Sequence, residues 1–262
     1  MDSALRRLVK ETLQKFDIGI VRHSNLVQLI EKNTKTQNRI DLILELPDRH
    51  SWRLLKAADN SQSQLGQDLF ALSELDFKRG GFFVEFGAAN GIDLSNTYLL
   101  EKEFEWTGIL AEPGKGWHRD LKNNRSSYIE TDCVWRDSNS SLTFNEADTA
   151  EHSTIDAYSS SDRHSRSRRQ GNRYKVNTIS LEDVLDKYHA PKEIDYLSID
   201  TEGSEYEILR DFNFDKYRFK IITCEHNFTP TREKIFSLLT RNGFVRKLTE
   251  YSRFDDWYVK GD

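Results

Sequence analysis

The chain has 262 residues, of which 37% are hydrophobic and 31% charged, and its formal net charge is −5. This length fits one large α/β domain or one domain with an added segment. The 5 tryptophans, 10 tyrosines and 15 phenylalanines need a packed core, so the composition excludes a disordered chain. The acidic balance argues against a protein dedicated to binding nucleic acid.

Apolar runs and cysteines bear on the location of the protein. The N-terminus lacks an apolar run long enough for a signal peptide, and no stretch approaches the roughly 18 apolar residues that span a bilayer. The two cysteines, Cys133 and Cys224, each lie in a predicted strand far from the other, so we expect no disulfide. These features predict a cytoplasmic protein without a membrane span.

Residues 1–60 are predicted to form a helical accessory segment, separate from the residues that carry chemistry. Apolar residues recur there at helical spacing. They are Leu5, Leu8, Val9, Leu13 and Phe16, followed by Leu26, Leu29 and Ile30. The pattern leaves three roles open: packing on the main domain, joining two copies into a homo-oligomer, or shaping a substrate entrance.

From residue 61 to residue 262, strands alternate with helices of about ten residues. The predicted strands cover 81–86, 107–111, 128–132, 195–200 and 220–224, followed by 245–249 and 256–260. This alternation predicts a Rossmann-like α/β fold with a central, mostly parallel sheet flanked by helices. Ligands of such sheets bind beyond the carboxyl ends of the strands, so the residues after each strand form the candidate site.

Residues 150–173 interrupt this pattern with serine, arginine and histidine. The composition does not support a packed core, which predicts a solvated loop. A second interpretation is a mobile lid whose arginines meet an anionic substrate.

A glycine turn follows the first predicted strand of the sheet, at Gly87-Ala88-Ala89-Asn90-Gly91. Glycine lets the backbone turn tightly and approach a ligand closely. Glu85, at the strand end, can interact with a positively charged group of that ligand. The Gly-x-x-x-Gly spacing differs from the pyrophosphate fingerprint of dinucleotide enzymes.

Two more strands end in acidic residues. Glu112 ends the second strand, where a carboxylate can accept hydrogen bonds from both ribose hydroxyls of an adenosine. Asp132 ends the third strand, where it can meet the adenine amino group, with Cys133 beside the ring. Because like charges repel, three acidic strand ends in one cleft indicate a ligand with a cation and several hydrogen-bond donors.

Several short motifs together resemble the FkbM-type methyltransferase family, over residues 60–260. The matching pieces are Ser63-Gln64, Gly66-Gln67-Asp68, Phe83-Val84-Glu85, Gly87-Ala88, Gly91, Ser95-Asn96-Thr97, Trp106, Gly108-Ile109, Glu112-Pro113, Leu197-Ser198-Ile199-Asp200, Glu202-Gly203, Glu205 and Glu225-His226-Asn227. The resemblance implies a class I methyltransferase fold that binds S-adenosylmethionine. It also implies O-methylation of a hydroxyl on a sugar, a glycan or a secondary metabolite.

The resemblance also implies roles for residues at the strand ends. Those expected to bind the cofactor are Gln64, Gln67, Glu85, Gly87, Ala88, Asn90, Gly91, Asn96, Glu112, Pro113, Asp132, Cys133 and Asp200. Within this set, the methionine end would contact Gln64, Gln67, Asn90 and Asn96. The residues expected to face the transferred methyl are Asp200, Glu202, Glu225 and His226.

Methyl transfer to a hydroxyl needs alignment of the reacting groups and a route for the hydroxyl proton. His226 is the first candidate base, because an unperturbed imidazole titrates near pH 6.5, and Asp200 is the second. The competing interpretation of His226 is a structural histidine at a strand end. Asp200 and Glu225, with His226 or Asn227, could also bind magnesium or manganese and lower the pKa of a substrate hydroxyl.

Two other functions stay open at this stage. The first is another nucleotide-dependent enzyme on the same layered fold. The second is a non-catalytic module that binds a partner through residues 1–60 and the arginine-rich segment. Neither explains the acidic strand ends as directly as a methyltransferase does.

Overall fold

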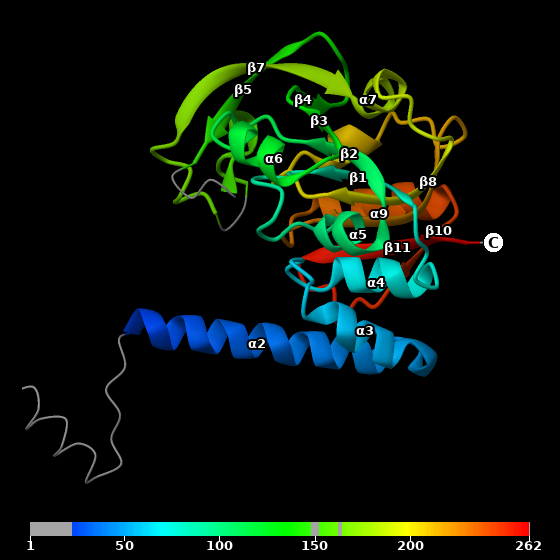
Figure 1. Ribbon diagram of the computed structural model, residues 1–262. Coiled ribbons are helices and arrows are strands. Elements are labelled where there is room, and N and C mark those ends of the chain that lie inside the picture. Colours follow the sequence, from blue (N-terminus) through cyan, green and yellow to red (C-terminus); the bar gives the residue numbers. More distant parts are fainter. Residues whose placement is uncertain (1–22, 148–151, 162–163, 262) are drawn as a thin grey trace, which may run out of the picture.

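The computed structural model describes residues 23–147, 152–161 and 164–261. Within these ranges a central sheet carries helices on both faces, and a second, smaller sheet lies beside it (Figure 1). The predicted α/β fold with a central, mostly parallel sheet is therefore confirmed.

The helices have the following bounds: α2 (His23–Glu45), α3 (Ser51–Ala58), α4 (Gln67–Glu74), α5 (Tyr98–Phe104), α6 (His118–Asn124), α7 (Leu181–Lys187), α8 (Glu205–Leu209) and α9 (Thr231–Arg241), with 3₁₀ turns η1 (Asp48–His50) and η3 (Asp156–Tyr158). The central strands are β1 (Phe82–Phe86), β2 (Thr107–Ala111), β3 (Tyr128–Glu130), β8 (Glu193–Ile199), β9 (Arg218–Glu225), β10 (Phe244–Lys247) and β11 (Asp255–Lys260). The second sheet contains β4 (Cys133–Trp135), β5 (Ser141–Glu146), β6 (Thr154–Ile155) and β7 (Asn172–Ser180).

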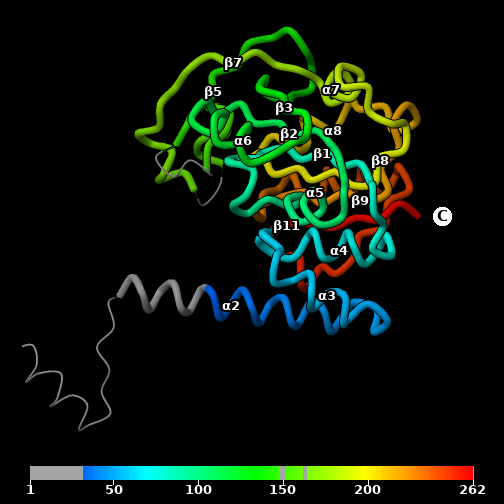
Figure 2. The backbone as a smooth tube through the Cα atoms, in the orientation of Figure 1, coloured from blue at the N-terminus to red at the C-terminus, as the bar shows by residue number. Residues whose placement is uncertain are grey.

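The described strands of the central sheet lie in the order β10-β11-β9-β8-β1-β2-β3. The five strands from β9 to β3 in this order are parallel, whereas β11 runs antiparallel to both of its neighbours, β9 and β10. Figure 2 shows the C-terminal strand β11 returning beside β9. Because β1 pairs with both β2 and β8, the chain changes its winding direction there, and a ligand crevice is expected at the carboxyl ends of these strands.

Alternating side chains bury both faces of the central sheet. On β1, Val84 and Phe86 join a core formed with α7, α8 and α9, while Phe83 joins a second core formed with α3 to α6. Successive residues of a strand point to opposite faces, so a strand covered on both sides is apolar at nearly every position. This explains why every residue of β1 except Glu85 is apolar.

The second sheet was not expected from the sequence. The predicted strand 128–132 is shorter, because β3 ends at Glu130 and β4 begins at Cys133. The described part of the polar segment 150–173 contributes β6, η3 and the start of β7 rather than only loop. β6 pairs with β5, and β5 pairs with β7, so backbone hydrogen bonds stabilise a segment whose side chains are mostly polar.

The predicted N-terminal helices are present where the structure describes them. Leu42 and Ile43 of α2 and Leu54 of α3 are buried in the core under α4, so this part packs on the domain. The predicted helix from Leu5 to Phe16 lies outside the described residues. Joining of two copies through these helices stays a prediction. No helix among the described residues is both long and apolar enough to cross a membrane.

Candidate functional site

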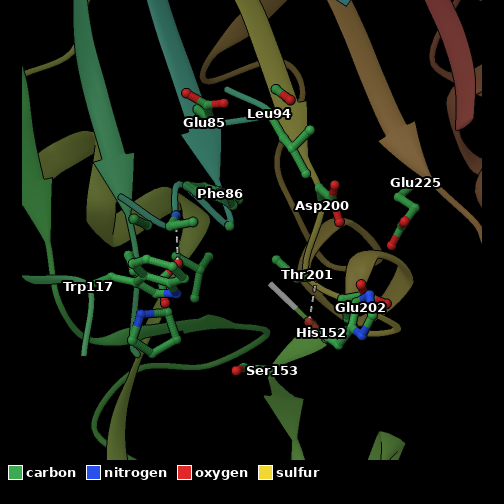
Figure 3. A pocket seen from close by; sticks show the side chains of 18 of the residues that line it. Glu85, Phe86, Leu94, Trp117, His152, Ser153, Asp200, Thr201, Glu202 and Glu225 are labelled. Carbon is green, nitrogen blue, oxygen red and sulfur yellow. Dashed lines mark hydrogen bonds between the residues drawn. The ribbon is translucent and has the colours of Figure 1, made fainter. Parts of the chain in front are cut away.

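A pocket opens at the carboxyl ends of β1, β2, β8 and β9, where the second sheet covers it (Figure 3). Ten predicted site residues line it: Gln64, Glu85, Gly87, Asn96, Glu112, Pro113, Cys133, Asp200, Glu202 and Glu225. Six others are not among the lining residues: Gln67, Ala88, Asn90, Gly91, Asp132 and His226. Parallel strands therefore bring most of the predicted residues together, as expected for their carboxyl ends.

Close packing of the protein backbone requires a glycine at position 87, even without a ligand. Its φ is +80°, and a Cβ added there would lie 1.8 Å from the carbonyl oxygen of Asp200. The Asp200 amide in turn donates to the Phe86 carbonyl at 3.2 Å. The sequence predicted close approach to a ligand, but the close approach in the structure joins the loops that follow β1 and β8.

Glu85 organises the loop after the glycine turn. Its carboxylate accepts hydrogen bonds from the Asn96 amide at 2.7 Å and from the Ser95 hydroxyl at 2.9 Å, and a third from the Thr97 hydroxyl at 2.5 Å. The buried Arg125 guanidinium lies 3.6 Å away. Both carboxylate oxygens are thus used inside the protein, so Glu85 holds the pocket wall in place more than it offers an acceptor to a ligand.

Three amides predicted to contact the cofactor have different surroundings. Asn96 donates to the Ser198 hydroxyl at 2.9 Å, and its buried Oδ1 has no hydrogen-bond partner within the described protein. Gln67 donates to Asp255 at 2.8 Å, and Asn90 accepts from the amides of its own turn. Of these three residues, Asn96 lines the pocket and also has an acceptor atom without a partner in the described protein.

Glu112 lies at the end of β2 with its carboxylate fixed by the backbone. Oε2 accepts from the Ala89 amide at 2.9 Å and Oε1 from the Gly114 amide at 2.6 Å. Burial raises the pKa of Glu112 to about 7, although the two amide hydrogen bonds lower it. Each oxygen can accept a further hydrogen bond, as two ribose hydroxyls would require.

The end of the pocket near Glu112 is partly apolar. Trp117, Val134 and Phe144 line it, together with Cys133. Burial raises the pKa of the Cys133 thiol to about 12, so this side chain is neutral at physiological pH. Asp132, which was predicted to meet an adenine, does not line the pocket, because the chain bends into the second sheet after β3.

Carboxyl groups gather at the opposite end. Asp200, Glu202 and Glu225 each place one oxygen within 4.8 Å of the others (Figure 3). Burial raises the pKa of Asp200, and burial with the neighbouring charge of Asp200 raises that of Glu225 well above its ordinary value. Oε2 of Glu225 is buried with no hydrogen-bond partner in the described protein. This end of the pocket therefore favours a cation or a hydrogen-bond donor.

His226 follows β9 but faces away from the pocket. Its Nδ1 accepts from the Phe228 amide at 3.0 Å, and its Nε2 lies 3.8 Å from Asp256, which Arg232 holds. Burial lowers the pKa of His226, while the Asp256 carboxylate raises it. Side chains alternate along an extended chain, so the position of Glu225 in the pocket turns its neighbour away. The role of His226 as a base stays a prediction.

Sequence reasoning missed several residues of the pocket wall. They are Trp117, Phe144, His152, Ser153, Ile155, His164 and Phe254. Four of them, from His152 to His164, belong to the segment predicted as a solvated loop or lid. The histidines in that segment were the only sequence signal, and a polar composition does not reveal which residues of a segment are buried.

The family model described as Methyltransferase FkbM domain matches residues 85–256, which is more than half of the chain. The chain belongs to the FkbM methyltransferase domain family. The predicted resemblance to this family is confirmed. Membership implies S-adenosylmethionine as the cofactor.

Solved structures with similar folds are distant in sequence. Precorrin-6y C5,15-methyltransferase from Geobacter metallireducens GS-15 has a TM-score of 0.40 and 11% identity, over 73% of this chain and 85% of that chain. A putative RNA methyltransferase from Pyrococcus horikoshii has a TM-score of 0.38 and 12% identity, over 80% and 85%. A fibrillarin/Nop5p complex has a TM-score of 0.34 and 16% identity, over 75% and 79%. No curated protein matches the chain.

Proposed function

We propose that this FkbM-family protein is an S-adenosylmethionine-dependent O-methyltransferase that acts on a hydroxyl of a sugar, a glycan or a related secondary metabolite. The observation that carries the proposal is a pocket with two unlike ends. One end has a backbone-fixed carboxylate, Glu112, beside apolar walls, and the other has the carboxyl groups of Asp200, Glu202 and Glu225.

The residues present fit this cofactor. Glu112 can accept from two ribose hydroxyls, and the buried Oδ1 of Asn96 and Oε2 of Glu225 lack partners that an ammonium group could supply. Buried carboxyl groups also favour a sulfonium cation. When bound, the cofactor supplies a methyl group on a positively charged sulfur. The protein aligns an acceptor oxygen with that carbon and excludes water from the reacting atoms.

A hydroxyl acceptor is supported by the chemistry of the carboxylate end. Carboxylate oxygens accept hydrogen bonds from hydroxyl groups, and neighbouring hydroxyls of a sugar can engage more than one of them. The same three carboxylates are hard oxygen ligands of the kind that magnesium or manganese prefers. We therefore include a divalent ion at this position in the proposal. The experiment with a chelator, described below, tests whether turnover depends on it.

Replacing Glu112 with glutamine should weaken binding of S-adenosylhomocysteine at least tenfold. The change removes a charged acceptor, worth about 1.5–3 kcal/mol, and turns an NH₂ group toward the Ala89 or Gly114 amide. Because the ionised carboxylate is the acceptor and its pKa is about 7, wild-type affinity should rise about tenfold from pH 6 to pH 8. Calorimetry at both pH values measures both effects.

The matched control is Glu105→Gln, because Glu105 is exposed and pairs with Arg79 on the surface. It should bind as the wild type does and keep the same pH dependence. If Glu112→Gln retained wild-type affinity, the ribose would lie elsewhere in the pocket.

The function is tested by transfer of label from S-adenosyl-[methyl-³H]methionine to a panel of methyl glycosides, with and without a chelator. We expect label in the sugar fraction for at least one member, and none when its accepting hydroxyl is blocked as an ether. Loss of turnover with chelator, restored by magnesium or manganese, would support a metal. Label transferred only to nitrogen or carbon acceptors would overturn the O-methyltransferase assignment.

A further inference from the structure

One side of helix α2 packs on the domain, and the opposite side faces outward. Leu42 and Ile43 of α2 are buried in the core under α4. The Arg39 guanidinium donates to the Ala58 carbonyl at 3.0 Å and to the Ser61 carbonyl at 2.6 Å. Figure 1 shows α2 at the bottom of the molecule, with α3 and α4 between it and the central sheet. The domain therefore holds α2 in place and leaves its other side on the surface.

Large apolar residues occupy that outward side. Ile40 is 40% exposed and Leu44 is 73% exposed. Residues four positions apart are neighbours on a helix surface, so these two share one side of α2. The adjoining helix α3 exposes Trp52 and Leu55. Among the described residues, four of the eight exposed large hydrophobic side chains thus lie on these two helices, and such gathering marks an interaction surface.

A regular spacing of four and three residues extends this apolar side along α2. The residues at this spacing are Leu26, Ile30, Asn33, Gln37, Ile40 and Leu44, which we call the α2 seam. Two helices that pack as a coiled coil have this heptad spacing. The charged residues of α2 all lie off the seam, whereas the water-facing side of a surface helix is normally charged. They are Glu31, Lys32, Lys35, Arg39, Asp41 and Glu45.

The order of residue types along the seam is the same from either end: two apolar residues, two amides and two apolar residues. A second copy can therefore lie antiparallel on it, with the Lys35 backbones of both copies at the same level. The facing pairs are then Leu26 with Leu44, Ile30 with Ile40 and Asn33 with Gln37. Apolar layers meet apolar layers, and the central amides, which both donate and accept hydrogen bonds, fix the register.

We propose that this protein forms an antiparallel homodimer in which the α2 seams of two copies pack against each other. Each seam is a strip about 27 Å long and about 10 Å wide, which is smaller than the roughly 800 Å² per partner of a stable complex. Trp52 and Leu55 enlarge this area, and α2 is already folded on the domain, so little ordering is required. The expected dimer dissociates in the micromolar range.

The charges next to the seam favour a second copy over a lipid surface. Asp41 follows Ile40 and Glu45 follows Leu44, and both carboxylates would repel anionic lipid headgroups. In the antiparallel pair, by contrast, the opposite ends of the two helix dipoles lie side by side, which is favourable.

Sedimentation of the full chain between roughly 1 μM and 1 mM tests self-association. The mean mass should rise with concentration from 30.7 kDa toward twice that value. Leu44→Glu should raise the dissociation constant at least tenfold, because the symmetric interface buries the new carboxylate twice. Val245→Glu makes the same kind of change at an exposed position of β10 and should dimerise as the wild type does. A wild-type protein that stays monomeric throughout would overturn the proposal.

Disulfide formation between cysteine variants tests the antiparallel register. Ile30→Cys and Ile40→Cys, mixed and mildly oxidised, should form a covalent dimer, because the two positions face each other. Either variant alone should not, because its two copies would lie about 15 Å apart along the helices. The native Cys133 and Cys224 are buried and should not interfere. Cross-linking of Ile40→Cys with itself would indicate parallel helices and contradict the proposed register.

The remaining outcome is a monomer that uses the seam for another partner. If the wild-type protein stayed monomeric but bound vesicles of phosphatidylcholine and phosphatidylserine, and Leu44→Glu did not, the seam would be a lipid-binding surface and the dimer proposal would fail. None of these outcomes bears on the methyl transfer proposed above, because no seam residue lines the pocket.

Discussion

Gly87→Ala should destabilise the ligand-free protein by about 3 kcal/mol or more. The new Cβ would lie 1.8 Å from the Asp200 carbonyl, a backbone atom that cannot move without displacing β8, and the residue would keep a left-handed φ of +80°. Overpacking typically costs about 1–3 kcal/mol and the left-handed conformation about 1–2 kcal/mol. Urea unfolding in the absence of any cofactor measures the loss directly.

The variant Gly80→Ala separates the cost of overpacking from the cost of the left-handed backbone conformation. Gly80 also has a positive φ, +63°, but an added Cβ there meets nothing within 4 Å. This variant should therefore lose only about 1 kcal/mol, from backbone conformation alone. Equal losses in the two variants would mean that the contact between Gly87 and Asp200 contributes nothing, and that the turn serves the ligand instead.

The second large effect is expected for Arg168→Ala, which should lower the free energy of unfolding by about 3–5 kcal/mol. Arg168 is buried, and its removal breaks its ion pair with the Glu202 carboxylate, which is 9% exposed. Breaking a buried pair by removing one partner usually costs this much. Thermal and urea unfolding should agree on the size of this loss.

Two further variants identify the cause of that loss. Arg169 is the exposed neighbour of Arg168, so Arg169→Ala should change stability by less than about 0.5 kcal/mol. Adding Glu202→Gln to Arg168→Ala should recover part of the stability, because the group left behind is then neutral. If Arg168→Ala were as stable as Arg169→Ala, the segment would behave as the solvated loop that its composition suggests.

Much of the candidate site was predictable from the sequence, because residues at the carboxyl ends of parallel strands lie at one edge of the sheet. Glu112, Asp200 and Glu225 follow apolar strands, and the carboxyl ends of those strands necessarily meet at one edge. The same alternation of side chains explains why His226 lies behind the wall when Glu225 lies in it. The orientation of the His226 side chain could have been derived from the sequence, because the derivation requires only that the strand ending near Glu225 is recognised.

The partners of individual side chains were decided by tertiary contacts. Glu85 was predicted to meet a ligand cation, but the loop at residues 95–97 and Arg125 take up its carboxylate. Those partners lie ten or more positions along the chain, and local propensity carries no information about them. The glycine turn also depends on a contact between residues far apart in the sequence, because the atom that excludes a side chain at Gly87 belongs to Asp200.

By itself, the sequence determined the α/β fold, the order along the chain of the central strands and the edge of the sheet where the candidate site lies, because periodicity and strand ends are local properties. Only the tertiary structure decided that part of the serine- and arginine-rich segment forms the second wall of the pocket. Its burial depends on long-range contacts, chiefly the ion pair of Arg168 with Glu202 and the pairing of β6 with β5. A polar composition predicts solvation unless such partners are known, and the fold supplies them.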